Sequence, residues 1–332
     1  MWQRSESPGQ VLLTGASGFV GRRLAPVLEV LGWQVACVTR DPRRARRHWP
    51  RRTWLAADLA HPDDVRRVLD GCRVAFYLVH SLAEESPALI ERERRMAQTF
   101  LRAAEAASVE RIVYLGATAP QGPPSVHLQS RLEVGRVLRS ERSRVSTLEL
   151  RAGMIVGYGS TSWQIVRDLA ARLPAMILPR WLQTRSQPVA IDDVIVALAT
   201  GARIPLEGSA SFDLPGPEIM TYRETLLRTA ELIGHRRPVT VDVPLLSPML
   251  SAQWVRLVTM ADWSVARELV QGLSSDLLAR SDEYWQLTGQ SPLLSFDQAV
   301  RRALEDELRA SETPRSVGAR AFEGLVDRVA GY

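Results

Sequence analysis

Three glycines near the start of the chain have the spacing of a phosphate-binding loop. Gly15, Gly18 and Gly21 follow an apolar run at residues 11–13 and come just before an amphipathic stretch. We expect the first glycine to turn the chain sharply out of a strand, the second to let the backbone approach a pyrophosphate, and the third to let the new helix pack closely on the sheet. Unpaired N–H groups at the helix N-terminus would face the phosphates. The pattern predicts a dinucleotide site with these contact residues: Gly15, Ser17, Gly18, Phe19, Val20 and Gly21.

The residue after the second predicted strand indicates which dinucleotide binds. An acidic residue there would bond the 2′-hydroxyl of NAD, but the strand at residues 34–39 is followed by Arg40, with Arg43 close behind. An arginine can stack on adenine and hold a 2′-phosphate through forked, charge-assisted hydrogen bonds. We therefore predict NADP, with NAD as the alternative. Most of the seven arginines between residues 40 and 52 are expected on a solvated loop.

Two further strand ends provide candidate cofactor contacts. Asp58 and Leu59 follow the strand predicted at residues 54–57 and are placed to touch the adenine edge, although a helix cap or a loop is an equally good interpretation of Asp58. His80 and Ser81 follow the apolar run at 74–79, where the backbone would pass the ribose and the pyrophosphate. Either of these two could instead be a turn residue.

The composition excludes several kinds of chemistry. The chain has 42 basic residues besides histidine and none of them is lysine, so Schiff-base and P-loop lysine chemistry are excluded. Two cysteines are too few for a disulfide framework or a metal cluster. No apolar run approaches the roughly 20 residues of a membrane helix, and no signal-peptide pattern opens the chain, so we expect a cytoplasmic protein. The net charge of +5 is interspersed and lacks an aromatic platform, which argues against nucleic-acid binding.

The order of the predicted strands and helices, which position these residues, indicates the fold class. Strands and helices alternate six times up to about residue 150, with long helices at about 84–107 and 126–142; residues 91–95 of the first are expected on its solvated face. This alternation is typical of an α/β fold, a Rossmann-type doubly wound parallel sheet. We predict a dinucleotide-binding domain at 8–155 and a smaller, mainly helical cap at 156–332, some of whose segments return to the sheet. The site would lie between them.

Several stretches resemble the extended or atypical short-chain dehydrogenases/reductases, and most closely the NmrA-like and YbjT-like NAD(P)-binding proteins. The resemblance covers roughly residues 10–300 and is carried by Thr14–Gly21, Phe76–Ser81, His127–Arg131, Glu149–Gly157, Pro179–Trp181 and Gly216–Glu218. It implies a Rossmann fold and a nicotinamide dinucleotide. In the broader family, a serine after the fifth strand and a Tyr-x-x-x-Lys pair on the next helix carry the chemistry.

This chain departs from the family at all three catalytic positions. Gly116-Ala117 stands where the serine would be, and His127 and Arg131 stand where the tyrosine and lysine would be. Arg131 could still bond the ribose hydroxyls, and His127 could donate a proton near neutral pH, or could simply begin a helix. If the alignment holds, Thr118, Tyr158 and Trp163 line the cleft, and the acids Asp192 and Asp193 are helix caps or ligands.

Two functions remain open at this point. The first is an NADP(H)-dependent oxidoreductase or isomerase acting on a small molecule, with His127, or a water held by Thr118, as proton donor. The second is a non-catalytic dinucleotide-binding regulator or accessory subunit, as in the NmrA-like branch, which the missing Ser, Tyr and Lys favour. We expect a monomer or a homodimer. A peripheral membrane contact through residues 243–260 is less expected than a buried cap helix, because that stretch carries little positive charge.

Overall fold

The computed structural model describes residues 8–80, 87–172, 175–235, 239–243 and 275–312 of the 332-residue chain. Ser81 and nearly all of the stretch at 243–260, for which predictions were made from the sequence, lie outside these residues. No helix in the described part is long and apolar enough to cross a membrane.

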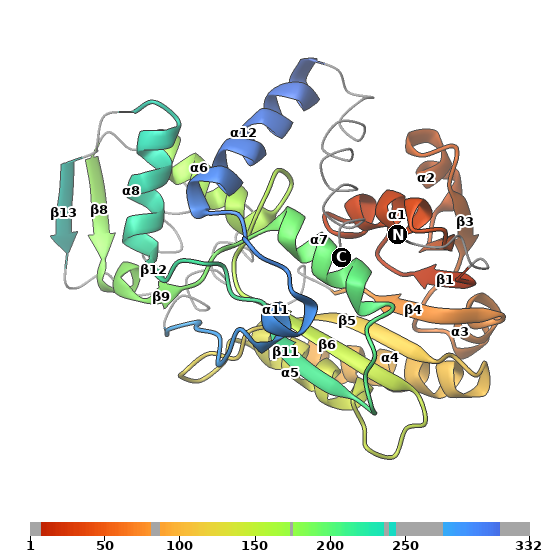
Figure 1. The fold of residues 1–332 in the computed structure, drawn as a ribbon. Helices are drawn as coiled ribbons and strands as arrows, with labels where there is room; N and C mark the ends of the chain where they lie inside the picture. Colours follow the sequence, from red (N-terminus) through yellow and green to blue (C-terminus); the bar gives the residue numbers. More distant parts are fainter. Residues whose placement is uncertain (1–7, 81–86, 173–174, 236–238, 244–274, 313–332) are drawn as a thin grey trace.

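A seven-stranded parallel sheet forms the centre of the described structure (Figure 1). From one edge to the other its strands are β11 (Ala210–Asp213), β6 (Ser146–Ala152), β5 (Arg111–Ala117), β4 (Cys72–Tyr77), β1 (Gln10–Leu13), β2 (Gln34–Thr39) and β3 (Thr53–Ala56). The strand order reverses between β1 and β4, and open α/β sheets bind their ligands outside the carboxyl ends of the strands at such a point. The predicted Rossmann fold is confirmed.

Helices cover both faces of the sheet, as the nearly all-apolar strands require. One face packs against α1 (Gly21–Val30), α2 (Pro42–His48) and α7 (Ile191–Gly201). The other face packs against α3 (Pro62–Leu69), α4 (Pro87–Ala106) and α5 (Val126–Leu138). Strand β11 and helix α7 come from the C-terminal half of the chain, so that half contributes directly to the sheet layer. The division at residues 155 and 156 remains a prediction.

The other described elements from residue 155 onward form a smaller region beside the carboxyl ends of the strands (Figure 1). The apolar core of this region includes Trp163 and Phe296. The elements are the strands β7 (Ile155–Val156), β8 (Ala175–Pro179), β9 (Arg185–Ser186), β10 (Val189–Ala190), β12 (Met220–Thr221) and β13 (Val239–Val243), the 3-10 helix at Arg180–Gln183, and the helices α6 (Thr161–Arg172), α8 (Tyr222–Leu232), α11 (Glu283–Thr288) and α12 (Phe296–Glu312). The expected helical cap is thus accompanied by short strand pairs.

Three local expectations were wrong. The arginine-rich stretch after β2 contains helix α2, because Asp41 accepts a hydrogen bond from the backbone N–H of Arg44 and Pro42 begins the helix. Glu93 was expected on a solvated face but is buried against α5, where the Ser130 hydroxyl donates to its carboxylate at 2.7 Å. The helix predicted at 126–142 ends at Leu138.

Candidate functional site

The glycine loop joins β1 to α1 at the point where the strand order reverses. Thr14, fully buried, fixes its start: its hydroxyl donates to the carbonyl of Phe76 at 2.8 Å and accepts from the N–H of Leu78 at 2.9 Å. This bridge holds the end of β1 against the end of β4. Gly15 has φ +63°, and a Cβ there would lie 2.5 Å from the carbonyl oxygen of Leu78. Only glycine fits this turn, as predicted.

The other two glycines differ in what surrounds them. A Cβ on Gly21 would overlap the backbone of Gly15 and Ala16, so this glycine lets the helix start pack on the loop itself rather than on the sheet. A Cβ on Gly18 would meet only the carbonyl oxygen of Gly15, at 3.1 Å, and the residue is exposed. The open side of Gly18 is the feature expected where a phosphate group approaches the backbone.

The start of α1 suits an anion. Its N-cap residue, Val20, supplies no side-chain hydrogen bond, and the first turn contains no acid. Within the described residues, the N–H groups of Phe19 and Val20 donate to no backbone acceptor. Unpaired N–H groups and the positive end of the helix dipole favour negative charge at this position. Ser17 is exposed next to them. The loop therefore fits a dinucleotide pyrophosphate.

Two arginines after β2 have no polar partner among the described residues. Arg40 and Arg43 are exposed, and within the described part of the chain their guanidinium groups form no hydrogen bond or ion pair. Asp41, the nearby acid, is a helix cap: one of its oxygens accepts from the N–H of Arg44 at 2.9 Å. The arrangement offers unpaired positive charge where a 2′-phosphate would lie.

Asp58 takes part in its own turn. One carboxylate oxygen accepts from the N–H of Ala60 at 3.0 Å, and the Asp58 N–H donates to the carboxylate of Asp64 at 3.0 Å. Leu59 is buried in the apolar layer beneath α3 and α4. These contacts support the loop interpretation of Asp58, and its contact with adenine remains a prediction.

His80 follows β4 and is exposed to solvent although many protein atoms surround it. This burial lowers its pKa, and the positive charge of Arg131 and the proximity of His127 lower it further. The imidazole is then neutral near pH 7.

The end of β5 and the start of α5 bring the catalytic candidates together. Thr118 is buried, and its N–H donates to the carbonyl of Ala152 at 3.2 Å. His127 is buried in the first turn of α5, after the N-cap Ser125. Arg131, one turn later, donates from Nη2 to the carbonyl of Leu115 at 3.0 Å, with a longer bond to that of Gly116. Arg131 thus ties α5 to the carboxyl end of β5.

Other cleft predictions do not agree with the structure. Trp163 has 1% of its surface exposed and belongs to the C-terminal apolar cluster, so it does not line an open site. Asp192 pairs with Arg302 of α12. The carboxylate of Asp193 is buried and accepts from the N–H of Leu294 at 3.0 Å. Both acids therefore hold the C-terminal segment and are not placed as substrate ligands.

One contact that the sequence did not indicate joins the start of α1 to the segment that follows β7. Arg22 and Arg23, the first side chains after Gly21, both donate to the carbonyl of Tyr158, at 3.1 and 2.7 Å. Gly159 follows with φ +90°, and a Cβ there would overlap the Arg22 guanidinium. The only sequence signal was the arginine pair directly after the motif, which gave no indication of its partner.

Comparisons with known proteins agree with this geometry. The NAD dependent epimerase/dehydratase family matches residues 11–137, from β1 to α5. The match confirms the predicted resemblance to extended short-chain dehydrogenases/reductases, a family that depends on a nicotinamide dinucleotide.

Individual relatives are more distant. A ceramide reductase of Caulobacter vibrioides is 27% identical over 246 residues, which cover 72% of this chain and 75% of the relative. Among solved structures, MoeE5 in complex with UDP-glucose and NAD has a TM-score of 0.69 and 20% identity, covering 92% of this chain and 100% of that one. The UDP-glucose 4-epimerase of Thermotoga maritima has a TM-score of 0.68 and 14% identity over the same shares. At these identities the solved structures establish the fold alone.

Proposed function

We propose that the protein is an NADP(H)-dependent oxidoreductase that reduces a carbonyl compound. The observation that carries the proposal is the grouping of His127 and Arg131 on one face of α5, electrostatically coupled to His80 at the end of β4. Residues four apart on a helix lie on the same side. The positions are those of the family's tyrosine and lysine, beside a loop that fits a dinucleotide.

The two free arginines support NADP as the cofactor. Arg40 and Arg43 present unpaired positive charge after β2, and forked hydrogen bonds from arginine to a phosphate are among the stronger polar contacts in proteins. NAD is the alternative, since the solved structures of MoeE5 hold NAD. The dinucleotide, when bound, supplies the hydride.

The side chains of this chain then have to orient the substrate and supply one proton. His80 is neutral near pH 7 because its pKa is lowered, so it is not the imidazolium donor. His127 is the other histidine at this place, and its imidazole could donate a proton to the oxygen of the carbonyl as its carbon accepts the hydride. Arg131, held by the carbonyls of Leu115 and Gly116, has donors for the ribose hydroxyls.

A turnover screen tests this proposal. Purified protein with NADPH would be assayed against quinones, aldehydes, enones and a ceramide, the last because one relative is a ceramide reductase. We expect oxidation of NADPH with one substrate class, and a drop of about 100-fold or more in His127→Gln, the range of general acid catalysis. His235→Gln, an exposed residue after α8, is the matched control and should keep full activity. Equal activity of the two variants would remove His127 from the mechanism.

The second candidate is a dinucleotide-binding regulator or accessory subunit without catalysis, as in the NmrA-like branch. It is favoured by Gly116-Ala117 in place of the serine and by a β5–α5 pair without the tyrosine and lysine. Tight NADPH binding without turnover on any substrate, together with a partner that co-purifies and dissociates on NADPH addition, would support this candidate and overturn the first.

A further inference from the structure

Arg23 connects three separate segments near the glycine loop. Its Nη1 donates to the carbonyl of Phe19 at 3.2 Å, and its guanidinium lies 4.9 Å from the centre of the Phe19 ring. Its Nη2 donates to the carbonyl of Tyr158 and also contacts the carboxylate of Asp306 at 3.4 Å. One side chain thus contacts Phe19 in the glycine loop, Tyr158 in the segment that follows β7, and Asp306 in helix α12.

Phe19 is the part of this arrangement that belongs to the glycine loop. The peptide that joins Phe19 to Val20 carries the Val20 N–H, which donates to no backbone acceptor in the described chain. Because this peptide is planar, holding the Phe19 carbonyl fixes the direction of the Val20 N–H before any ligand arrives. Such preorganisation raises affinity, because less freedom is lost on binding.

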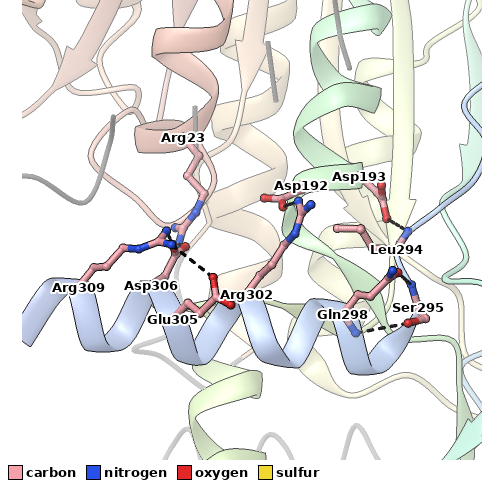
Figure 2. A network of polar contacts seen from close by, with 10 residues as sticks. All are labelled: Arg23, Asp192, Asp193, Leu294, Ser295, Gln298, Arg302, Glu305, Asp306 and Arg309. Atoms are coloured by element: carbon pink, nitrogen blue, oxygen red, sulfur yellow. Dashed lines mark hydrogen bonds and ion pairs between the residues drawn. The ribbon is translucent and has the colours of Figure 1, made fainter. Parts of the chain in front are cut away.

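Asp306 holds Arg23 from the other side and comes from a well-anchored helix. The first half of α12 is buried in the C-terminal apolar cluster through Phe296, Ala299, Val300 and Ala303. Figure 2 shows that the Arg23 side chain extends from α1 to the second half of α12, where Asp306 lies between Arg23 and Arg309. The Arg23 and Asp306 side chains are only 16% and 14% exposed, so solvent screens their interaction weakly.

Among the described residues, no second carboxylate is ready to replace Asp306. Asp192 also attracts Arg23, but it is paired with Arg302 of the same helix (Figure 2). Arg22 lies beside Arg23, and their like charges repel each other. Without Asp306 the two guanidinium groups would face each other with one counter-ion fewer, and Arg23 would be free to turn away from Phe19.

We propose that Asp306 is a positioning residue for the dinucleotide: through Arg23 it holds Phe19 and Tyr158 in the conformation that receives the pyrophosphate. Asp306, 283 residues away in sequence from Arg23, thereby sets the cofactor affinity from helix α12. This inference rests on the proposed binding of NADP(H) at the glycine loop.

The test compares two variants of α12 that lose the same charge. In Asp306→Asn we expect the Kd for NADPH to rise about tenfold, equivalent to about 1.4 kcal/mol. Glu305→Gln is the matched control. The Glu305 carboxylate is 58% exposed and pairs only with Arg309 within the described residues. The Kd of this variant for NADPH should therefore stay within about twofold of that of the unchanged protein. Kd would be measured by titration of NADPH fluorescence.

A double-mutant cycle separates positioning from general stability. Because Asp306 acts through Arg23, Asp306→Asn should add no further loss of affinity in the Arg23→Gln background. A purely structural role would instead lower the urea midpoint of the cofactor-free protein and leave Kd unchanged. An unchanged Kd in Asp306→Asn while the unchanged protein binds NADPH would overturn this inference alone. Failure of the unchanged protein to bind any dinucleotide would overturn the proposed function as well.

Discussion

A Cβ atom on Gly135 would overlap the carboxylate of Glu149, so helix α5 can cross β6 at this point only because residue 135 has no side chain. Glu149 is 1% exposed, and its Oε2 accepts from Nε of Arg139 at 2.6 Å, with Arg151 at 3.4 Å. A Cβ on Gly116 would lie 2.7 Å from the other oxygen. A buried carboxylate therefore fills the space beside the position where the family carries its serine.

The close approach of Glu149 to Gly116 predicts that a serine at position 116 lowers the stability of the protein. Gly116→Ser would push its side chain against Glu149, and overpacking of this kind destabilises by about 1–3 kcal/mol. The measurement is the free energy of unfolding in urea. Ala117→Ser places the same hydroxyl one residue later, where a Cβ is already accommodated, and should lose less. If Gly116→Ser were as stable as the unchanged protein, the absence of the serine would need another explanation.

The pair formed by Glu149 and Arg139 predicts a second stability effect. Arg139→Gln leaves the buried carboxylate with Arg151 as its remaining cation, and removing one partner of a buried pair costs about 3–5 kcal/mol. Arg136→Gln is the control on the same helix. Its pair with Glu133 is a surface contact worth about 0–1 kcal/mol, since the Arg136 side chain is 68% exposed. Similar urea midpoints for the two variants would contradict the structural role of Glu149.

The sheet and the glycine loop could be predicted because their signals are local. Apolar runs separated by helical periods gave β1, β2 and β4 within one or two residues, and Gly15 has the positive φ that its place in the motif requires. Helix α2 was missed because its capping signal, Asp41-Pro42, lies in a run of arginines that suggested a solvated loop.

The residues that contact the site from other parts of the chain could not be predicted, because such contacts join segments that are distant in sequence. Nothing near Asp306 in sequence indicates Arg23, and nothing near Glu149 indicates Gly135. Glu93 was placed in solvent because its neighbours are charged, although it lies four residues before Ala97 on the buried face of α4. In a run of charged residues, the sequence alone thus does not show which residue forms a hydrogen bond with a distant segment.

His80 predicts a pH dependence of stability. Its pKa is lowered in the folded protein, chiefly by burial, while in the unfolded chain it has its usual value of about 6.5. Below that pH the unfolded state takes up a proton that the folded state does not, so stability falls as the pH falls. His80→Gln should therefore lose less stability than the unchanged protein between about pH 7 and pH 5. Urea midpoints at both pH values measure this, with His235→Gln as the control; identical slopes in all three proteins would contradict the lowered pKa.

Arg40 gives the sharpest test of the proposed preference for NADP. Its guanidinium forms no hydrogen bond or ion pair within the described chain, so Arg40→Ala would remove the proposed phosphate contact without breaking a polar contact to the described residues. Losing a hydrogen bond to a charged group costs about 1.5–3 kcal/mol, so the Kd for NADPH should rise about 10- to 150-fold while that for NADH changes little. Arg47→Ala, an exposed arginine on α2 with no partner in the described structure, is the matched control for the loss of charge and should leave both constants nearly unchanged. Equal weakening of NADPH and NADH by Arg40→Ala would show that the arginine contacts the adenine face alone, and the assignment of NADP would then be wrong.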